Sequence, residues 1–186
     1  MNLTRHSPSI ASQHAFLSPS SPAWLRYDVD KLDRVYHNHM AARRGTELHA
    51  VAKELIRLGI RLPDTTETLN AYVNDAIGFR LTPEQVLFYS ENCFGTADAC
   101  GFKNDTFRVF DLKTGVSEGK MDQLRIYAAL FCLEYKYPPN QIKIELRIYQ
   151  NDAVHVEEPD PHDIFVVMDR IITADERIKY LREEAM

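Results

Sequence analysis

Residues 93–115 read CFGTADACGFKNDTFRVFDLKTG, and this stretch predicts a β-hairpin. Residues 93–102 and 106–114 are strand-like runs, and the pair Asn104-Asp105 between them is typical of a turn. We therefore expect the two strands to pair as antiparallel neighbours in a sheet.

Three charged side chains of this hairpin suggest chemistry. Asp111 and Lys113 share one face of a strand, because alternate residues point the same way. A hairpin partner can bring Asp98 beside Asp111. Two converging carboxylates repel each other unless a cation joins them, and such oxygen ligands suit Mg²⁺ or Mn²⁺. The lysine can offset negative charge on a phosphate, and the plain alternative is a cross-strand salt bridge at the end of the sheet.

Hydrophobic periodicity outside the hairpin predicts four helices and three further strands. The strands are expected at 85–90, 141–150 and 153–157, and 141–150 alternates cleanly enough to be half-buried. The helices are expected at 30–59, 66–77, 119–137 and 160–184, with a break near Thr173, where Asp175 can start a last segment. The order α-α-β-β-β-α-β-β-α indicates an α/β fold with a mixed central sheet flanked by helices.

Length and composition limit the function classes. The chain has 186 residues and a formal net charge of −5. We expect a flexible leader over residues 1–22 and a single domain over 23–186. No apolar run approaches the roughly 20 residues of a membrane helix, the start lacks a signal pattern, and three cysteines are too few for a disulfide framework. A reduced, cytoplasmic protein with no membrane partner is expected.

Four short motifs follow one another in a fixed order along the chain. They are Gly45-Thr-Glu-Leu-His49, Gly95-Thr-Ala-Asp98, Asp111-Leu-Lys113-Thr-Gly115 and Gln123-Leu-Arg-Ile-Tyr127. Each is weak alone, but together, on the expected helices and strands, the set resembles the RecB-type nuclease domains of the PD-(D/E)xK superfamily. The resemblance runs from Leu17 to about Gln150 and implies a restriction-endonuclease-like core.

The resemblance also implies roles for individual residues. His49, Asp98 and Asp111 would bind the metal, with the backbone carbonyl of Leu112 as a further ligand, and Lys113 would be the catalytic lysine. Residues 123 and 127 share a helix face, and Gln123 and Tyr127 would touch the DNA backbone or brace the metal site. Considered alone, His49 is more often a packing histidine and Tyr127 more often a core residue, whereas in the context of the motifs core and contact roles are equally expected for Tyr127.

Other charged residues near the motifs have two interpretations. Arg43, Arg44, Lys120 and Arg125 can grip phosphates or simply face solvent. Glu91 is a further candidate acid of the site or a plain glutamate at a strand end. Residues 1–60 carry a net +3 and residues 152–186 a net −6, so a local basic face could meet DNA while the acidic end lies elsewhere.

The expected activity is that of a Mg²⁺- or Mn²⁺-dependent DNA nuclease, and more specifically an exonuclease. The cysteines do not fit the four-cysteine pattern of relatives that hold an iron–sulfur cluster, and no ATP-binding loop is present, so neither cluster nor ATP is expected.

By analogy the chain is similar to phage or mobile-element recombination exonucleases, which would act in a bacterial cytoplasm. A recombination or single-strand-binding protein is a candidate partner, and an oligomer is left open. The rival hypotheses are an inactive nuclease-fold module that binds DNA or a protein, and a structural protein.

Overall fold

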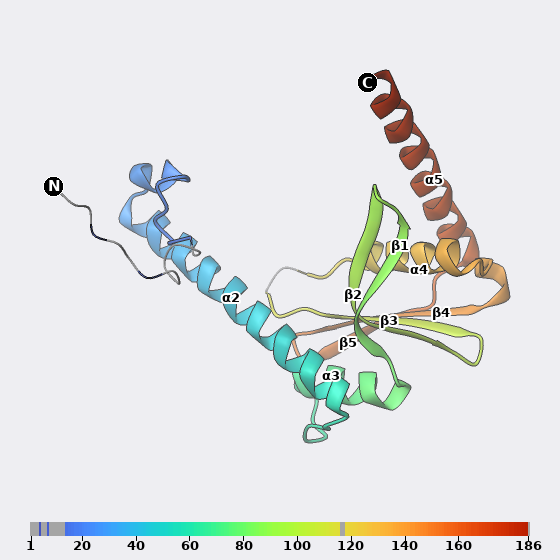
Figure 1. Ribbon diagram of the computed structural model, residues 1–186. Helices are drawn as coiled ribbons and strands as arrows, with labels where there is room; N and C mark the ends of the chain where they lie inside the picture. Colours follow the sequence, from blue (N-terminus) through green and yellow to red (C-terminus); the bar gives the residue numbers. More distant parts are fainter. Residues whose placement is uncertain (1–3, 5–6, 8–13, 116–117, 186) are drawn as a thin grey trace. The chain divides into compact units, whose positions relative to one another are not determined.

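The computed structural model describes residues 4, 7, 14–115 and 118–185, and contacts divide the chain into two units, Met1–Arg44 and Gly45–Met186 (Figure 1). Half of the leader predicted over residues 1–22 lies outside the described residues. The helices and strands are, in order, η1 (Pro22–Arg26), α2 (Val29–Leu58), α3 (Thr68–Phe79), β1 (Thr82–Ser90), β2 (Cys93–Lys103), β3 (Thr106–Leu112), α4 (Met121–Tyr135), η2 (Pro139–Gln141), β4 (Lys143–Gln150), β5 (Ala153–Glu157) and α5 (Pro161–Glu184).

The first unit contains η1 and the first half of α2. The Phe16 ring centroid lies 5.2 Å from that of Tyr36 and 5.1 Å from that of His39. Trp24 Nε1 donates to the backbone oxygen of Ser18 at 3.1 Å. The Phe16 contacts join the segment before α2 to that helix, and the Trp24 bond joins η1 to the residues that precede it.

The second unit is built on a five-stranded sheet in the order β1-β2-β3-β4-β5. The pairs β1–β2, β2–β3 and β4–β5 are antiparallel, whereas β3 and β4 are parallel. Parallel neighbours need a crossover, and α4 supplies it between β3 and β4. The predicted α/β class with a mixed sheet flanked by helices is confirmed.

Alternation along β3 divides the core between the two faces of the sheet. Val109 faces the cluster on the α4 and α5 side, and Phe110 faces the cluster on the α3 side. The second half of α2 packs on the same face of the sheet as α3, through Ala52 and Ile56. Helices therefore cover both faces of the central strands (Figure 1).

Burial of both faces corrects the prediction of a half-buried strand at 141–150. The side opposite the apolar residues carries Tyr149, which is fully buried. Its hydroxyl donates to Asp75 Oδ2 of α3 at 2.7 Å, and Arg147 Nη1 pairs with the same oxygen at 2.8 Å. On this side, Arg147 and Tyr149 therefore meet α3 rather than water, and only Lys143 at the start of the strand is exposed.

The predicted helix break near Thr173 is wrong, because α5 runs without interruption from Pro161 to Glu184. Asp175 was expected to start a new helix, but its side chain contacts another element. Its Oδ1 accepts from Ser90 Oγ at 2.6 Å and from Asn92 Nδ2 at 2.7 Å, at the turn between β1 and β2. The aspartate thus ties the middle of α5 to the hairpin.

None of the helices in the described part of the chain has both the length and the apolar character of a membrane span.

Candidate active site

The two predicted carboxylates meet where β2 and β3 begin to separate. Ala99 pairs with Phe110, and one further step of this register sets Asp98 opposite Asp111. Asp98 Oδ2 accepts a hydrogen bond from the backbone N–H of Leu112 at 2.9 Å. This bond holds the Asp98 side chain against the end of β3, beside Asp111.

Asp111 is a buried acid with an incompletely satisfied carboxylate. Only 3% of the residue is exposed. Lys113 Nζ donates to its Oδ1 at 3.1 Å and lies 3.0 Å from Oδ2, but Oδ2 has no partner with hydrogen-bond geometry. Burial, together with the charge of Asp98, raises the pKa of Asp111, while Lys113 and His49 oppose that rise. Such a site favours a bound cation or a proton.

His49 approaches the same carboxylates from the second half of α2. Its Nδ1 lies 3.5 Å from Asp98 Oδ2. The interaction with Asp98 is the main cause that raises the pKa of His49, the charge of Asp111 and the backbone of Leu112 add to it, and burial opposes it. His49 therefore makes a polar contact with Asp98, in place of the packing role that was the alternative for this histidine.

Gly45 explains how α2 comes so close to the strand end. The residue is buried, and a Cβ atom at this position would lie 2.7 Å from Thr114 Oγ1. A larger residue here would force either the Thr114 side chain or the helix to shift. The glycine of the first motif thus makes room for the third motif, and His49 follows one turn later.

Lys113 is positioned by residues from three segments. Its backbone N–H donates to the Tyr149 oxygen at 2.9 Å, and its Nζ donates to Gln123 Oε1 at 3.2 Å. A Cβ at Gly119 would lie 3.1 Å from Lys113 Cγ, so the lysine stem rests directly on that glycine. The ammonium group is consequently held between Asp111 and α4.

Gln123 and Tyr127 brace the hairpin from one face of α4. The Tyr127 hydroxyl donates to the backbone oxygen of Thr96 at 2.6 Å. The ring lies over Gly95, where a Cβ atom would be 3.0 Å from Cε1. Burial is the main cause that raises the pKa of Tyr127, and its hydrogen bond with Gln123 opposes that rise. Of the two predicted roles, the structure shows contacts of the bracing kind.

Sequence reasoning missed Gln150, a polar residue that is only 3% exposed. Its Oε1 accepts from the backbone N–H of Gly119 at 3.0 Å, and its Nε2 donates to the Gly115 oxygen at 2.7 Å. The amide therefore clamps both ends of the segment between Lys113 and α4. The sequence did carry a signal for its burial, because Gln150 lies on the same side of the strand as the alternating apolar residues.

Tyr72 of α3 was also missed. The residue is 2% exposed, and burial strongly raises its pKa, with Asp98 and Asp111 as further causes. The phenol therefore lies within electrostatic reach of both carboxylates. Its position on an apolar helix stripe gave no hint of this, because a buried tyrosine is usually a core residue.

Arg125 and Glu91 are not brought to the carboxylates. Arg125 lies about 200° around α4 from Gln123, and its guanidinium pairs with Glu157 at 2.8 Å and with Asp122 at 3.2 Å. Glu91 is exposed in the turn between β1 and β2, on the order of 15 Å along the strand from Asp98. Lys120 is exposed just before α4, and Arg43 and Arg44 are exposed on α2 in the first unit.

The donor set fits an oxygen-seeking divalent cation in chemistry, though not yet in arrangement. Two neighbouring carboxylates, one of them with a buried oxygen that lacks a hydrogen bond, favour a cation. Among residues 4, 7, 14–115 and 118–185, however, no three His, Cys, Asp or Glu side chains are grouped to hold one ion. His49 instead faces Asp98, so the shared three-ligand site remains a prediction.

A scan of protein-family models, a search of curated proteins and a search of solved structures each found no match to this chain. The interpretation of the site therefore depends on its own contacts.

Proposed function

We propose that this chain is a Mg²⁺-dependent deoxyribonuclease, and we expect it to act as an exonuclease. The observation that carries the proposal is the buried Asp111 carboxylate, which lies beside Asp98 and Lys113 and has one oxygen without a hydrogen bond. Burying one acid beside a second, partly exposed acid is unfavourable unless positive charge compensates for it. Cation binding would explain why the folded protein keeps this arrangement.

Asp98, Asp111 and His49 are the proposed ligands, and the Leu112 carbonyl is the proposed additional one. A bound Mg²⁺ would supply electrostatic stabilisation to a reacting phosphodiester and lower the pKa of water. To act as a ligand, His49 must turn from Asp98 and be neutral. Asp98 keeps its backbone tether to Leu112 through one oxygen, so its other oxygen is the one available to an ion.

Lys113 has the role of a charge partner for the reacting phosphate. Its ammonium group is half-buried and fixed by Asp111 and Gln123, so it needs little reorganisation when charge develops. The same group can hydrogen-bond and orient an attacking water. Gln123 and the Gly119 contact act by positioning this lysine.

The second candidate function is a nuclease fold that binds DNA or a protein without cleaving. The observation that favours it is the His49–Asp98 contact at 3.5 Å in place of a three-ligand group. The two functions differ in whether added Mg²⁺ produces cleavage. DNA binding without cleavage at any Mg²⁺ concentration would support the module.

The decisive experiment is product analysis on end-labelled single- and double-stranded DNA, with and without Mg²⁺. We expect mononucleotides or short products only with Mg²⁺, and no cleavage of a closed circular substrate if the enzyme needs an end. Lys113→Ala should lower the rate on the order of 10²–10³-fold. Lys103→Ala, at the exposed far end of the same hairpin, is the matched control and should cleave like wild type. Equal rates for the two variants would remove Lys113 from the mechanism.

A further inference from the structure

The helix α5 carries an apolar stripe whose residues are spaced alternately by three and four. This 3–4 spacing is typical of a helix that packs along another helix. The stripe residues are Ile164, Val167, Ile171, Ala174, Ile178, Leu181 and, at the C-cap, Ala185.

The first half of this stripe is used inside the chain. Ile164 is fully buried and Ile171 is 9% exposed, and both belong to the cluster on the α4 side of the sheet. The buried Asp175 fastens the helix at this level to Ser90 and Asn92. Up to this point, α5 is a normal covering helix.

The second half of the stripe has no cover in the described chain. Every residue from 176 to 185 is exposed. Ile178 is 39% exposed and Leu181 is 46% exposed, although both continue the spacing of the buried part. The pattern therefore extends about three turns past the body that it packs against.

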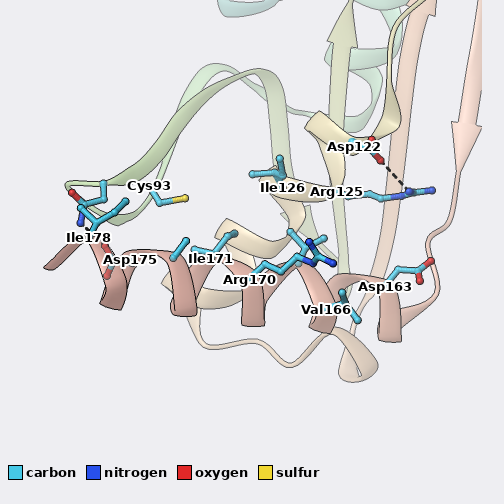
Figure 2. Close-up of a pocket in the computed structure, with 13 residues that line it drawn as sticks. Cys93, Asp122, Arg125, Ile126, Asp163, Val166, Arg170, Ile171, Asp175 and Ile178 are labelled. Carbon is cyan, nitrogen blue, oxygen red and sulfur yellow. Dashed lines mark hydrogen bonds and ion pairs between the residues drawn. The ribbon is translucent and has the colours of Figure 1, made fainter. Parts of the chain in front are cut away.

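A groove of about 680 Å³ runs beside α5 and ends at the exposed half. Figure 2 shows α5 side chains along one wall, with Ile126 and Arg125 of α4 across from them and Cys93 near Ile178. Ile178 belongs both to the groove and to the exposed stripe. The apolar surface is thus continuous from the groove to the last turns of the helix.

The charges that flank the exposed stripe indicate what covers it. Arg177 and Glu184 lie on one flank and Arg182 on the other, one heptad position from the stripe in each case. In a parallel pair of identical helices opposite flanks meet, which sets Arg177 against Arg182 of the second helix. In an antiparallel pair equal flanks meet, which sets Arg177 beside Glu184 of the second helix, twice by symmetry.

We propose that a second copy of this chain covers this surface through an antiparallel pairing of the C-terminal halves of α5. Ile178 lies opposite Leu181 of the second copy, and Ala174 lies opposite its Ala185. The last turn of each helix then lies at the open end of the other copy's groove. The contact is isologous, as expected for a two-fold dimer, and its short length makes the dimer weak and concentration-dependent.

Sedimentation equilibrium of the full chain, from about 5 to 500 μM, tests the proposal. The weight-average mass should rise from that of one chain toward that of two. Leu181→Glu should remain monomeric throughout, and circular dichroism should show an unchanged fold because this side chain is exposed. A wild-type chain that stays monomeric, or a dimer that survives Leu181→Glu, would overturn the proposal.

Charge reversal tests the antiparallel direction separately from the surface. Glu184→Arg should weaken dimerisation about tenfold, because it sets two like-charged pairs across the contact. Glu183→Arg makes the same charge change on the outer side of the helix and serves as the control. Combining Glu184→Arg with Arg177→Glu should restore wild-type dimerisation. Equal effects of the two single reversals, or no restoration, would exclude this pairing.

Discussion

At the scale of single residues, Asp111 combines burial with a nearby carboxylate, and the positive charges of Lys113 and His49 offset these two effects only in part. Its raised pKa means that the charged form is less favourable in the folded chain than in the unfolded chain. The ionised group therefore lowers stability above its unfolded pKa, and the folded chain gains stability as the pH falls through the raised value. A bound cation would reverse this balance.

This balance gives the first prediction, for Asp111→Asn. Without metal at neutral pH, the variant should have a Tm equal to or above that of wild type, because the unfavourable charge is gone. With Mg²⁺ at about 100 times its Kd, the wild type should gain about 2.7 kcal/mol of unfolding free energy, and the variant should gain little. Thermal melts with and without Mg²⁺ measure both. A loss of stability in the metal-free variant would show that the Lys113 pair outweighs the repulsion.

His49 gives the second prediction, which concerns pH. Its pKa is raised above the ordinary 6.5. The charged imidazole therefore adds to the stability of the metal-free fold below pH 6.5, and this added stability is lost as the pH rises through the folded pKa. Metal affinity should change in the opposite direction, because only neutral imidazole is a ligand.

Calorimetric titration with Mg²⁺ between about pH 6 and 8.5 should show affinity that rises with pH, by up to about tenfold per unit below the pKa. His49→Gln should flatten this dependence. His155→Gln, on the exposed edge strand β5, is the control and should keep it. A pH profile unchanged in His49→Gln would remove this residue from the ligand set.

At the scale of elements, the attachment of α5 to the hairpin depends on Asp175. The residue is 2% exposed, and the hydrogen bonds from Lys179, Ser90 and Asn92 hold its pKa at about 2. A lowered pKa contributes stability above the unfolded value near 3.8, and this contribution is lost as the pH falls from about 4 to about 2.

The third prediction is that Asp175→Ala releases α5 from the turn between β1 and β2. Hydrogen exchange should quicken in α5 and at this turn, the Tm should fall, and the loss of stability between about pH 4 and 2 should be smaller than in wild type. Asp169→Ala removes an exposed acid from the same helix and should change none of these. Exchange that quickens equally across the whole sheet would indicate global unfolding instead of the loss of a local attachment.

At the scale of the whole molecule, the proposed DNA binding depends on how charge is distributed along an acidic chain. Residues 1–60 carry a net +3 and residues 152–186 a net −6, within a total of −5. Phosphate contacts release counterions, so the logarithm of affinity falls linearly with the logarithm of salt concentration. Few contacts give a shallow slope.

The fourth prediction concerns Arg43 and Arg44. Replacing both with Ala should weaken DNA binding and flatten the salt slope by about 0.7 per lost contact on single strands and about 0.9 on duplex. Mg²⁺ affinity should not change. The control replaces Lys136 and Lys143, two exposed lysines, with Ala. If both double variants give the wild-type slope, the DNA path lies on other residues.

The sequence by itself determined the features that depend on near neighbours along the chain. Alternation assigned the faces of β3, and the turn pair at Asn104-Asp105 located the hairpin, because both signals span only a few residues. The spacing of Asp111 and Lys113 already implied the contact between them, which the structure places at 3.0 Å. The motif order likewise singled out His49 and Asp98, which lie 3.5 Å apart.

Only the tertiary structure decided which of these groups are buried and what fastens them. Gln150 closes the segment beside Lys113, Asp175 contacts a turn instead of starting a helix, and Tyr149 meets α3 instead of water. Each of these contacts joins residues that are more than thirty positions apart in sequence. Local periodicity carries no information on such pairs, because burial and electrostatic environment arise only when distant segments pack together.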